Sequence, residues 1–476
     1  MSNKIDRTVF PQSYSIFALL SIIYTVVVLN LFFPEYHTPI PIFFLILISA
    51  ILFFFFLHTL SIRWMSLNRQ IFYRHIFISA LFVRFFYMGV LYFYTWLYFP
   101  QHLPLEYNPS DAERYLVSGN MITGEIFNGE FISILDRYWR STADWGYPFF
   151  LGLINTFVFK SIIVAKLVNI FLGALTVLIL TKTVELLYNI QYARFIGIVL
   201  MLLPSLNWNN SFLLKETLMI FLMSLVVYNS IKIVKSHSLH LGRLIIIISA
   251  ISSFFYLRTA MAVLLFLSVA VYFILNLTKA KERKMGLAVS ILMIFAGVYG
   301  IADYSDELFQ IQEQYSNIEN IGEASITNKI SSGEISLATQ VALPLLTINS
   351  IISPYPTVLN MDERQLAILL NAHNEFVRII LYYFCLLGIF LTIKRDFRNS
   401  SLILMIALGY LMIVIIGAKA YEARFQLPSV PFLLILGSYG YFNASERVFK
   451  GFKYYVVIIM IVTIVWHLFK LNIRGL

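Results

Sequence analysis

Long apolar runs separated by short polar segments occupy almost all of the 476-residue chain. Most runs reach the roughly 17 to 25 residues that a helix needs to cross a hydrocarbon core of about 30 Å. Helices satisfy their own backbone hydrogen bonds over such a length, so an all-α polytopic membrane protein is predicted. The predicted transmembrane helices, about 13 in number, lie near residues 14–33, 39–60, 76–99, 161–187, 195–211, 215–235, 243–257, 259–277, 285–303, 374–394, 400–418, 425–443 and 454–470.

One further apolar run, "GYPFFLGLINTFVF" at 147–160, is too short to cross and is predicted to be an interfacial or re-entrant helix. When it is left out, the loops rich in Lys and Arg all fall on the side of the N-terminus. Basic residues favour the cytoplasmic side of a membrane, so the N-terminus is predicted to be cytoplasmic. These loops hold Arg63, Arg69, Arg74, Arg194, Lys232, Lys235, Arg243, Lys279, Lys281, Arg283, Lys284, Lys394, Arg395, Arg398, Arg447, Lys450 and Lys453.

Two long loops then face outward, and both are acidic. Residues 100–147 hold seven Asp or Glu against three Arg, and residues 304–373 hold eight against two basic residues. The chain is accordingly divided into two N-terminal helices at 1–75, a transmembrane core at 76–303 that includes a first outer loop at 100–160, an outer loop at 304–373, and C-terminal helices at 374–476.

Composition narrows the possible functions. The net charge of +10 suggests nucleic acid, but the basic residues lie beside the predicted spans, where they set topology, so no nucleic-acid partner is expected. Cys385 is the single cysteine, which excludes an intramolecular disulfide. The polar start leads into a full-length span and predicts an uncleaved first helix. No P-loop, HExxH or Cys/His cluster is present, so nucleotide-driven transport and a zinc site are unsupported.

The first outer loop carries the polar segment "YNPSDAERYL" at 107–116. In a helix, Asp111 and Tyr115 share one face, whereas Glu113 and Arg114 project elsewhere. Asp111 could be a cap near the start of a solvated loop helix. It could also be a general base at the membrane edge that accepts a proton from an acceptor hydroxyl.

Two more outer turns hold candidate cations. "LPSLNWNNSFLLKETL" places Lys215 and Glu216 at the head of a returning helix, as a structural pair or as a contact to an anionic lipid headgroup. "FFYLRTAM" places Arg258 at a turn, where it either extends to the interface or binds a phosphate with two parallel hydrogen bonds.

The last candidates lie toward the C-terminus. "GAKAYEARFQLPSVPF" holds Glu422 and Arg424 ahead of a span with two prolines, which can open backbone groups near the membrane surface. "NAHNEFVRIILYYF" begins a span with His373, either a satisfied interfacial residue or a catalyst.

In their order along residues 76–443, the segments "SDAERY", "GYPFFLGL", "LLKETL" and "YEARFQLPSVPF" resemble the GT-C superfamily of integral-membrane glycosyltransferases. The similarity is to the branch of protein mannosyltransferases and the aminoarabinose transferase of lipid A. Departures from that pattern include two spans that precede the one that would be first, and the acids Asp111 and Glu113, which are not adjacent.

The resemblance implies a GT-C-like fold whose acidic outer loops carry short interfacial helices, with a polyprenyl-phosphate sugar as the donor. Asp111 matches the acid that activates the acceptor hydroxyl, and Lys215, Arg258 and Arg424 are candidates for binding the lipid phosphate. No cofactor is certain, and a divalent metal stays open. Possible supporting residues are Glu113, Arg114, Tyr115, Glu216, Glu422 and His373.

The expected reaction is inverting transfer of a sugar to a glycan, lipid or protein acceptor, for a cell-surface glycan or glycolipid. It would occur on the extracytoplasmic face of a bacterial plasma (inner) membrane. A competing resemblance links "AHNEFVRIILYYFCLLGIFLTI" to O-antigen ligases and polysaccharide polymerases, in which a His and outer Arg residues handle a lipid-linked glycan. A transporter or flippase for lipid-linked sugar is a third alternative, although no pair of related halves with charged mid-membrane segments is evident.

Overall fold

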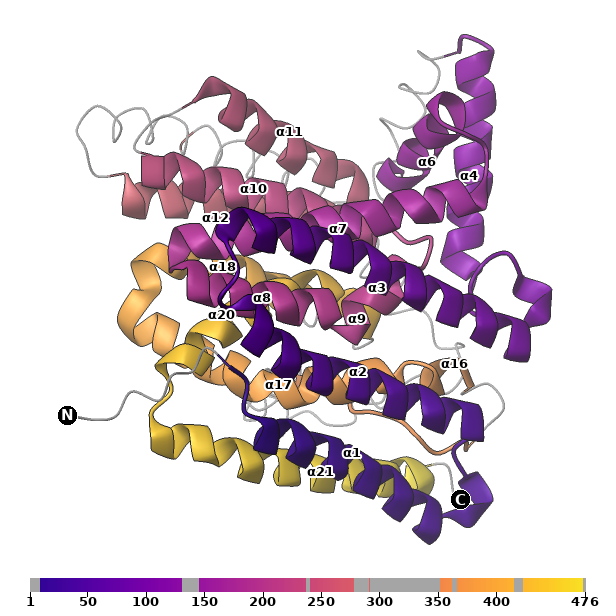
Figure 1. Cartoon of the computed structure of the whole chain (residues 1–476). Coiled ribbons are helices and arrows are strands. Elements are labelled where there is room, and N and C mark those ends of the chain that lie inside the picture. The colour runs from indigo at the N-terminus through magenta and orange to yellow at the C-terminus, as the bar shows by residue number, and fades with distance from the viewer. Residues whose placement is uncertain are drawn as a thin grey trace, which may run out of the picture.

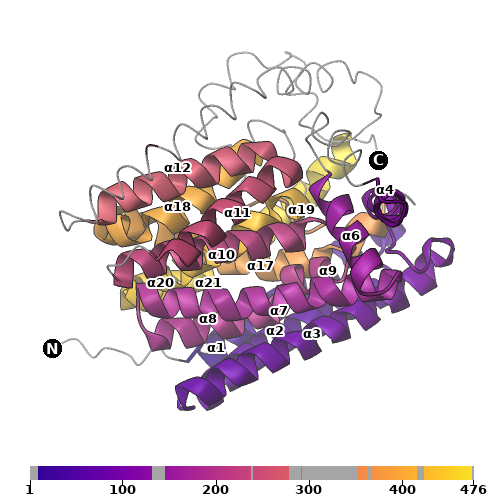
Figure 2. The same cartoon turned by 90° about the horizontal axis from the view of Figure 1, so that it is seen from above.

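The computed structural model describes residues 9–130, 145–236, 240–277, 291, 352–361, 366–414 and 423–473, and all regular secondary structure in these ranges is helical. Most of the helices lie side by side along a common direction (Figures 1 and 2). Within these ranges, eight helices are long and apolar enough to cross a membrane, or nine if one bent pair counts as a span. The protein is therefore an all-helical integral membrane protein.

The eight candidate spans account for most of the predicted apolar runs, whereas the predicted span 285–303 falls almost wholly outside the described residues. The total of thirteen stays a prediction. The eight are α1 (Gln12–Phe32), α2 (Ile40–Trp64), α3 (Arg69–Tyr98), α7 (Ile162–Leu187), α10 (Glu216–Ser236), α12 (Thr259–Asn276), the stretch Ala372–Met412 and α21 (Glu446–Ile473).

The stretch Ala372–Met412 changes direction at a π-helical segment. It consists of α17 (Ala372–Leu391), η4 (Thr392–Asp396) and α18 (Phe397–Met412). At the start of α18, Ser400 bonds with Tyr188 beside the end of α7. Near the other end of α18, Tyr410 bonds with Arg258, which lies between α11 (Leu241–Leu257) and α12. The chain therefore returns along the bundle after η4.

Prolines divide two other predicted spans. α8 (Ile190–Leu202) and α9 (Pro204–Asn210) are bent by 53° at Leu203, because the residue before a proline is forced out of the helical conformation. The run predicted at 425–443 is divided into α19 (Ala423–Gln426), η6 (Leu427–Ser429) and α20 (Val430–Asn443). Both breaks bring irregular backbone into the interior of the protein.

Glycines allow α17 and α20 to approach closely. A Cβ atom on Gly388 of α17 would lie 1.9 Å from the carbonyl oxygen of Leu436 in α20, and one on Gly440 would lie 2.4 Å from that of Phe384. Small residues spaced in this way let two helix backbones pack in direct contact inside a membrane. This contact fixes the position of α20, and with it the short helix α19 that precedes it.

Two shorter helices cover one end of the bundle. α4 (Ser110–Phe127) and α6 (Gly146–Phe157) pack against each other where Gly119 faces Leu151 and Gly152 faces Ile122. In Figure 1 the pair stands at a steep angle to the long helices, and at 12 residues α6 is too short to cross a membrane. This end of the bundle is called the α4 end below. Smaller described elements are η1 (Pro34–Tyr36), η2 (Pro100–His102) and α16 (Leu366–Leu369).

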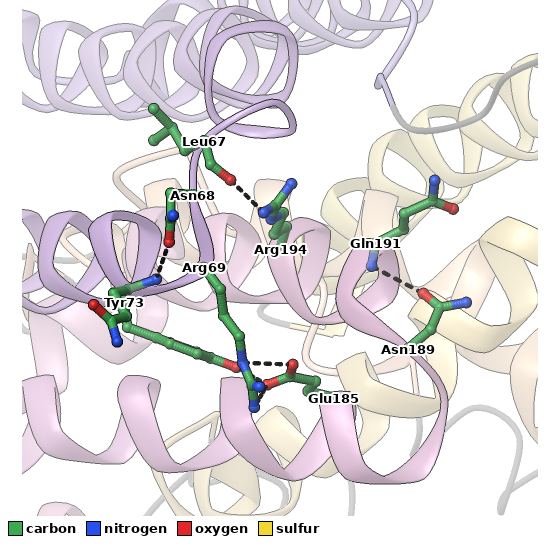
Figure 3. Close-up of polar contacts among 9 residues, drawn as sticks. Leu67, Asn68, Arg69, Tyr73, Glu185, Asn189, Gln191 and Arg194 are labelled. Atoms are coloured by element: carbon green, nitrogen blue, oxygen red, sulfur yellow. Dashed lines mark hydrogen bonds and ion pairs between the residues drawn. The ribbon is translucent and has the colours of Figure 1, made fainter.

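A polar cluster fastens the opposite end of the bundle (Figure 3). Asn68 and Asn189 accept backbone N–H groups in the first turns of α3 and α8 and so cap these helices. Arg69 pairs with Glu185 of α7 at 2.8 Å, and Arg194 donates to two backbone carbonyls of the α2–α3 connection. Two of the basic residues used to predict topology thus lie together here. The side of the membrane that this end faces stays a prediction.

Candidate functional site

Three of the singled-out residues, far apart in the sequence, meet at the α4 end. The Nη2 atom of Arg424 in α19 lies 2.7 Å from an Oδ atom of Asp111 in the first turn of α4. The Nε atom of the same guanidinium lies 3.9 Å from an Oε atom of Glu216, the first residue of α10. Asp111 and Arg424 are partly exposed, with 35% and 25% of their side chains accessible, whereas Glu216 is buried.

Arg258 adjoins this group through an aromatic ring. The guanidinium groups of Arg258 and Arg424 lie 5.7 and 4.8 Å from the centroid of the Phe425 ring, within reach of a cation–π contact. Arg258 also donates a hydrogen bond to the hydroxyl of Tyr410. Two of the predicted phosphate-binding cations are therefore neighbours across one phenylalanine.

The third predicted cation, Lys215, is mostly buried beside the same group. Its Nζ atom donates to the backbone carbonyl of Leu257 at 3.2 Å, which ties the head of α10 to the end of α11. Since Glu216 follows it directly, Lys215 lies in the chain segment that brings Glu216 to Arg424.

The other candidate residues of the first outer loop differ in exposure, as their positions on the helix predict. α4 has no side-chain cap, so Asp111 does not act as one. Glu113 and Arg114 are exposed. Tyr115, one turn after Asp111, is buried, and its ring centroid lies 5.3 Å from that of Tyr147 in α6. Tyr115 thus helps to seat α4 on α6.

His373 lies in the interior, at the start of α17. Its ring stacks on Tyr87 and meets the edge of Trp208, with centroid distances of 6.3 and 4.7 Å, and its Nδ1 bonds with the Leu370 carbonyl at 2.7 Å. Only 1% of the residue is exposed. Glu422, the remaining candidate, lies outside the described residues.

A buried ion pair that sequence reasoning missed supports the loop before α4. Glu106 and Lys166 of α7 are 3.2 Å apart with side chains 1% and 0% exposed. Glu106 also accepts the backbone N–H of Leu213 at 3.3 Å, and Lys166 lies 4.7 Å from the centroid of the Tyr92 ring. Glu106 thus connects the loop just ahead of Asp111 to α7 and to the segment before α10. A single lysine within the apolar run "SIIVAKLVNI" was the signal that could have revealed it.

Burial raises the pKa of Glu106, and the charge of Lys166 opposes that rise. Close by, the Asn169 amide in α7 donates to the Tyr147 hydroxyl at 2.8 Å and to the Phe212 carbonyl at 3.0 Å. Burial also raises the pKa of Tyr147, so its hydroxyl stays protonated. These contacts connect the loop before α4, the start of α6 and the segment before α10 to α7.

The arrangement places a carboxylate and a guanidinium side by side where solvent reaches both. A guanidinium binds phosphate oxygens through parallel N–H groups, and a carboxylate can accept a proton from a hydroxyl. Over the residues that the structure describes, no three His, Cys, Asp or Glu side chains gather as a metal site. A scan against protein-family models gives no match, and neither curated proteins nor solved structures include one that matches this chain.

Proposed function

We propose that the protein is a membrane glycosyltransferase that moves a sugar from a polyprenyl-phosphate donor to an acceptor hydroxyl, in the synthesis of a cell-surface glycan or glycolipid. The observation that carries the proposal is the 2.7 Å contact between Asp111 and Arg424. It brings the residue suited to activate the acceptor next to a residue suited to bind the leaving phosphate. The GT-C resemblance of the segments around these residues supports the same reaction.

In the proposed mechanism, Arg424 binds the phosphate of the donor at headgroup level, with Arg258 beside it across Phe425. The Asp111 carboxylate accepts the proton of the acceptor hydroxyl, whose oxygen forms a bond to the anomeric carbon. The bond between that carbon and the phosphate oxygen breaks, and the lipid phosphate leaves with its electron pair. A guanidinium stabilises the charge that develops on the leaving oxygen. A single displacement inverts the anomeric centre.

The ion pair also suggests an order of events. While Arg424 is paired with Asp111, part of its guanidinium is unavailable to a phosphate, and one oxygen of the carboxylate is occupied by the guanidinium. A phosphate arriving at Arg424 competes with Asp111 and releases it to face the acceptor. Glu216, 3.9 Å from the guanidinium and buried, keeps Arg424 in place during the exchange.

The test is Asp111→Asn in the full chain, purified and returned to lipid with candidate polyprenyl-phosphate sugars and acceptors. We expect glycosidic product, measured by mass spectrometry, to form about 10²- to 10⁴-fold more slowly, the range typical of a lost general base. Donor binding should be retained or become tighter, because Asp111 no longer competes with the phosphate for Arg424. Arg424→Gln should instead weaken donor binding.

Glu35→Gln provides the matched control, since it also neutralises an acid at the α4 end but lies outside the proposed site. Its turnover should equal that of the unmodified protein. Near-normal turnover of Asp111→Asn would remove Asp111 from the role of base.

The polymerase or ligase alternative gains no support from the position of His373, which is enclosed by Tyr87 and Trp208. It would be favoured if His373→Ala stopped glycan chain extension while Asp111→Asn did not. Movement of labelled lipid without any glycosidic product would favour the transporter alternative.

A further inference from the structure

An arginine that has no counter-charge among the described residues lies in the interior of the bundle. Arg84 is near the middle of α3 and is 1% exposed. Its Nη1 donates to the Ala80 carbonyl of its own helix at 3.1 Å. Its Nε has no hydrogen-bond partner, and no ion pair among the described residues includes it. A charge buried within a membrane helix is costly unless it is neutralised, so such a residue indicates a functional site.

Arg84 lines a small cavity between α3, α7, α8, α9 and α10, which lie together in Figure 2. The polar residues around the cavity are Arg84, Thr176, Asn210 and Thr217, and the rest of its wall is apolar apart from the backbone at Gly173. Its volume of about 10 Å³ corresponds to one particle the size of a water molecule. A lipid headgroup or a sugar phosphate is too large for it.

The N–H donors of Arg84 and Asn210 lie close together beside this cavity, next to Gly173. The point where a Cβ of Gly173 would lie is 2.8 Å from Arg84 Nε and 2.2 Å from Asn210 Nδ2. The carbonyl oxygen of the Asn210 side chain already accepts the Thr217 hydroxyl at 2.9 Å, which directs the amide NH₂ toward the arginine. Donors of this kind suit a ligand that accepts hydrogen bonds, and the positive charge favours an anion over a neutral molecule.

We infer that this cavity binds one small monovalent inorganic anion of the chloride class, held by Arg84 and Asn210. The anion supplies the counter-charge that no described side chain gives to Arg84. The inference does not depend on the proposed glycosyl transfer, because it concerns only the charge and the size of this cavity.

The test uses the full chain purified in detergent. Binding of radioactive chloride is measured directly, and thermal unfolding is followed as chloride replaces gluconate at constant ionic strength. We expect saturable binding of one chloride per chain. The unfolding midpoint should rise with the logarithm of the chloride concentration above the dissociation constant, as for any ligand of the folded state.

Asn210→Asp tests whether the cavity holds an anion or a water molecule, because it places a carboxylate of equal size beside Arg84. This variant should bind no chloride, and its midpoint in gluconate should equal or exceed that of the unmodified protein. Arg84→Met should also lose chloride binding. Arg194→Gln is the control, since that arginine donates to backbone carbonyls at the other end of the bundle, and chloride binding should be unchanged.

Equal midpoints in chloride and gluconate, together with no saturable chloride binding by the unmodified protein, would overturn the inference and leave water in the cavity. Chloride binding that persists in Asn210→Asp would overturn it as well. If Arg84→Met does not fold, the unmodified protein and Asn210→Asp still decide the question.

Discussion

Two ion pairs of equal length occupy opposite surroundings. Glu106 and Lys166 are 3.2 Å apart with their side chains fully enclosed. Glu446 and Lys450, one turn apart on α21, are also 3.2 Å apart, but 62% and 70% of their side chains are exposed. An exposed pair of this kind contributes little to stability, whereas loss of one partner from a buried pair leaves a charge in a medium of low dielectric constant. Burial, more than distance, determines how much the loss of one partner changes the free energy of unfolding.

Glu106→Gln is therefore expected to destabilise the fold strongly. It leaves the Lys166 ammonium buried without a counter-charge, which typically lowers the unfolding free energy by about 3–5 kcal/mol. The double variant Glu106→Gln/Lys166→Met removes both charges and should recover most of that loss. The unfolding free energy is measured by denaturation in mixed micelles.

The exposed pair gives the comparison. Glu446→Gln should change the unfolding free energy by less than about 0.5 kcal/mol. If Glu106→Gln were equally mild, or if the double variant were no more stable than the single one, the buried pair would not anchor the loop before α4.

The residues of the site could be selected from the sequence, but their meeting could not. Asp111, Glu216 and Arg424 each stood out as a polar residue close to an apolar run. Their contact depends on how α4, α10 and α19 pack, which is a long-range property that local periodicity does not encode. Glu106 was missed because it lies in a polar loop and looked ordinary until its burial was known. Arg84 was overlooked although it is the one charged residue in the predicted span 76–99.

At the scale of the elements, the contact between α17 and α20 depends on the absence of side chains. Gly388→Ala should destabilise the protein by about 1–3 kcal/mol, because the new methyl group would lie 1.9 Å from the Leu436 carbonyl oxygen and the helices must separate. The expected loss is measured as a lower unfolding free energy in mixed micelles.

Gly89→Ala in α3 is the matched change, since nothing lies within 4 Å of a Cβ there. It should be neutral or stabilise by up to about 1 kcal/mol, the usual preference of a helix for alanine. Equal effects of the two substitutions would show that α17 and α20 are not in close contact.

Apolar runs located the long helices well because a span needs a continuous apolar run of nearly fixed length. α1, α2, α3, α7, α10 and α12 all begin and end within a few residues of their predicted bounds, apart from the start of α3. Apolar runs were less informative where proline interrupts them, as at Pro204 and Pro428, because a proline can break a helix within a segment that stays apolar.

At the scale of the whole molecule, the orientation in the membrane is a prediction that labelling can test. In a Cys385→Ala background, cysteines are introduced at exposed positions in place of Gln101 at the α4 end and Ser66 at the opposite end. An impermeant maleimide applied to intact cells should label position 101 and not position 66, because the basic loops favour the cytoplasm. Permeabilised cells should label both. The reverse pattern would place the candidate site in the cytoplasm.

Because Arg424 contacts two acids, it restricts which substitutions the sequence can accept during evolution. One guanidinium contacts two carboxylates from separate parts of the chain, so a neutral residue at 424 removes the cation that Asp111 and Glu216 share. A neutral residue at either acid alone leaves Arg424 with one of its two carboxylates. Substitutions in contact do not add independently, so positions 111, 216 and 424 are expected to vary together among descendants of this chain. An alignment of related sequences would show this coupling as covariation among the three positions.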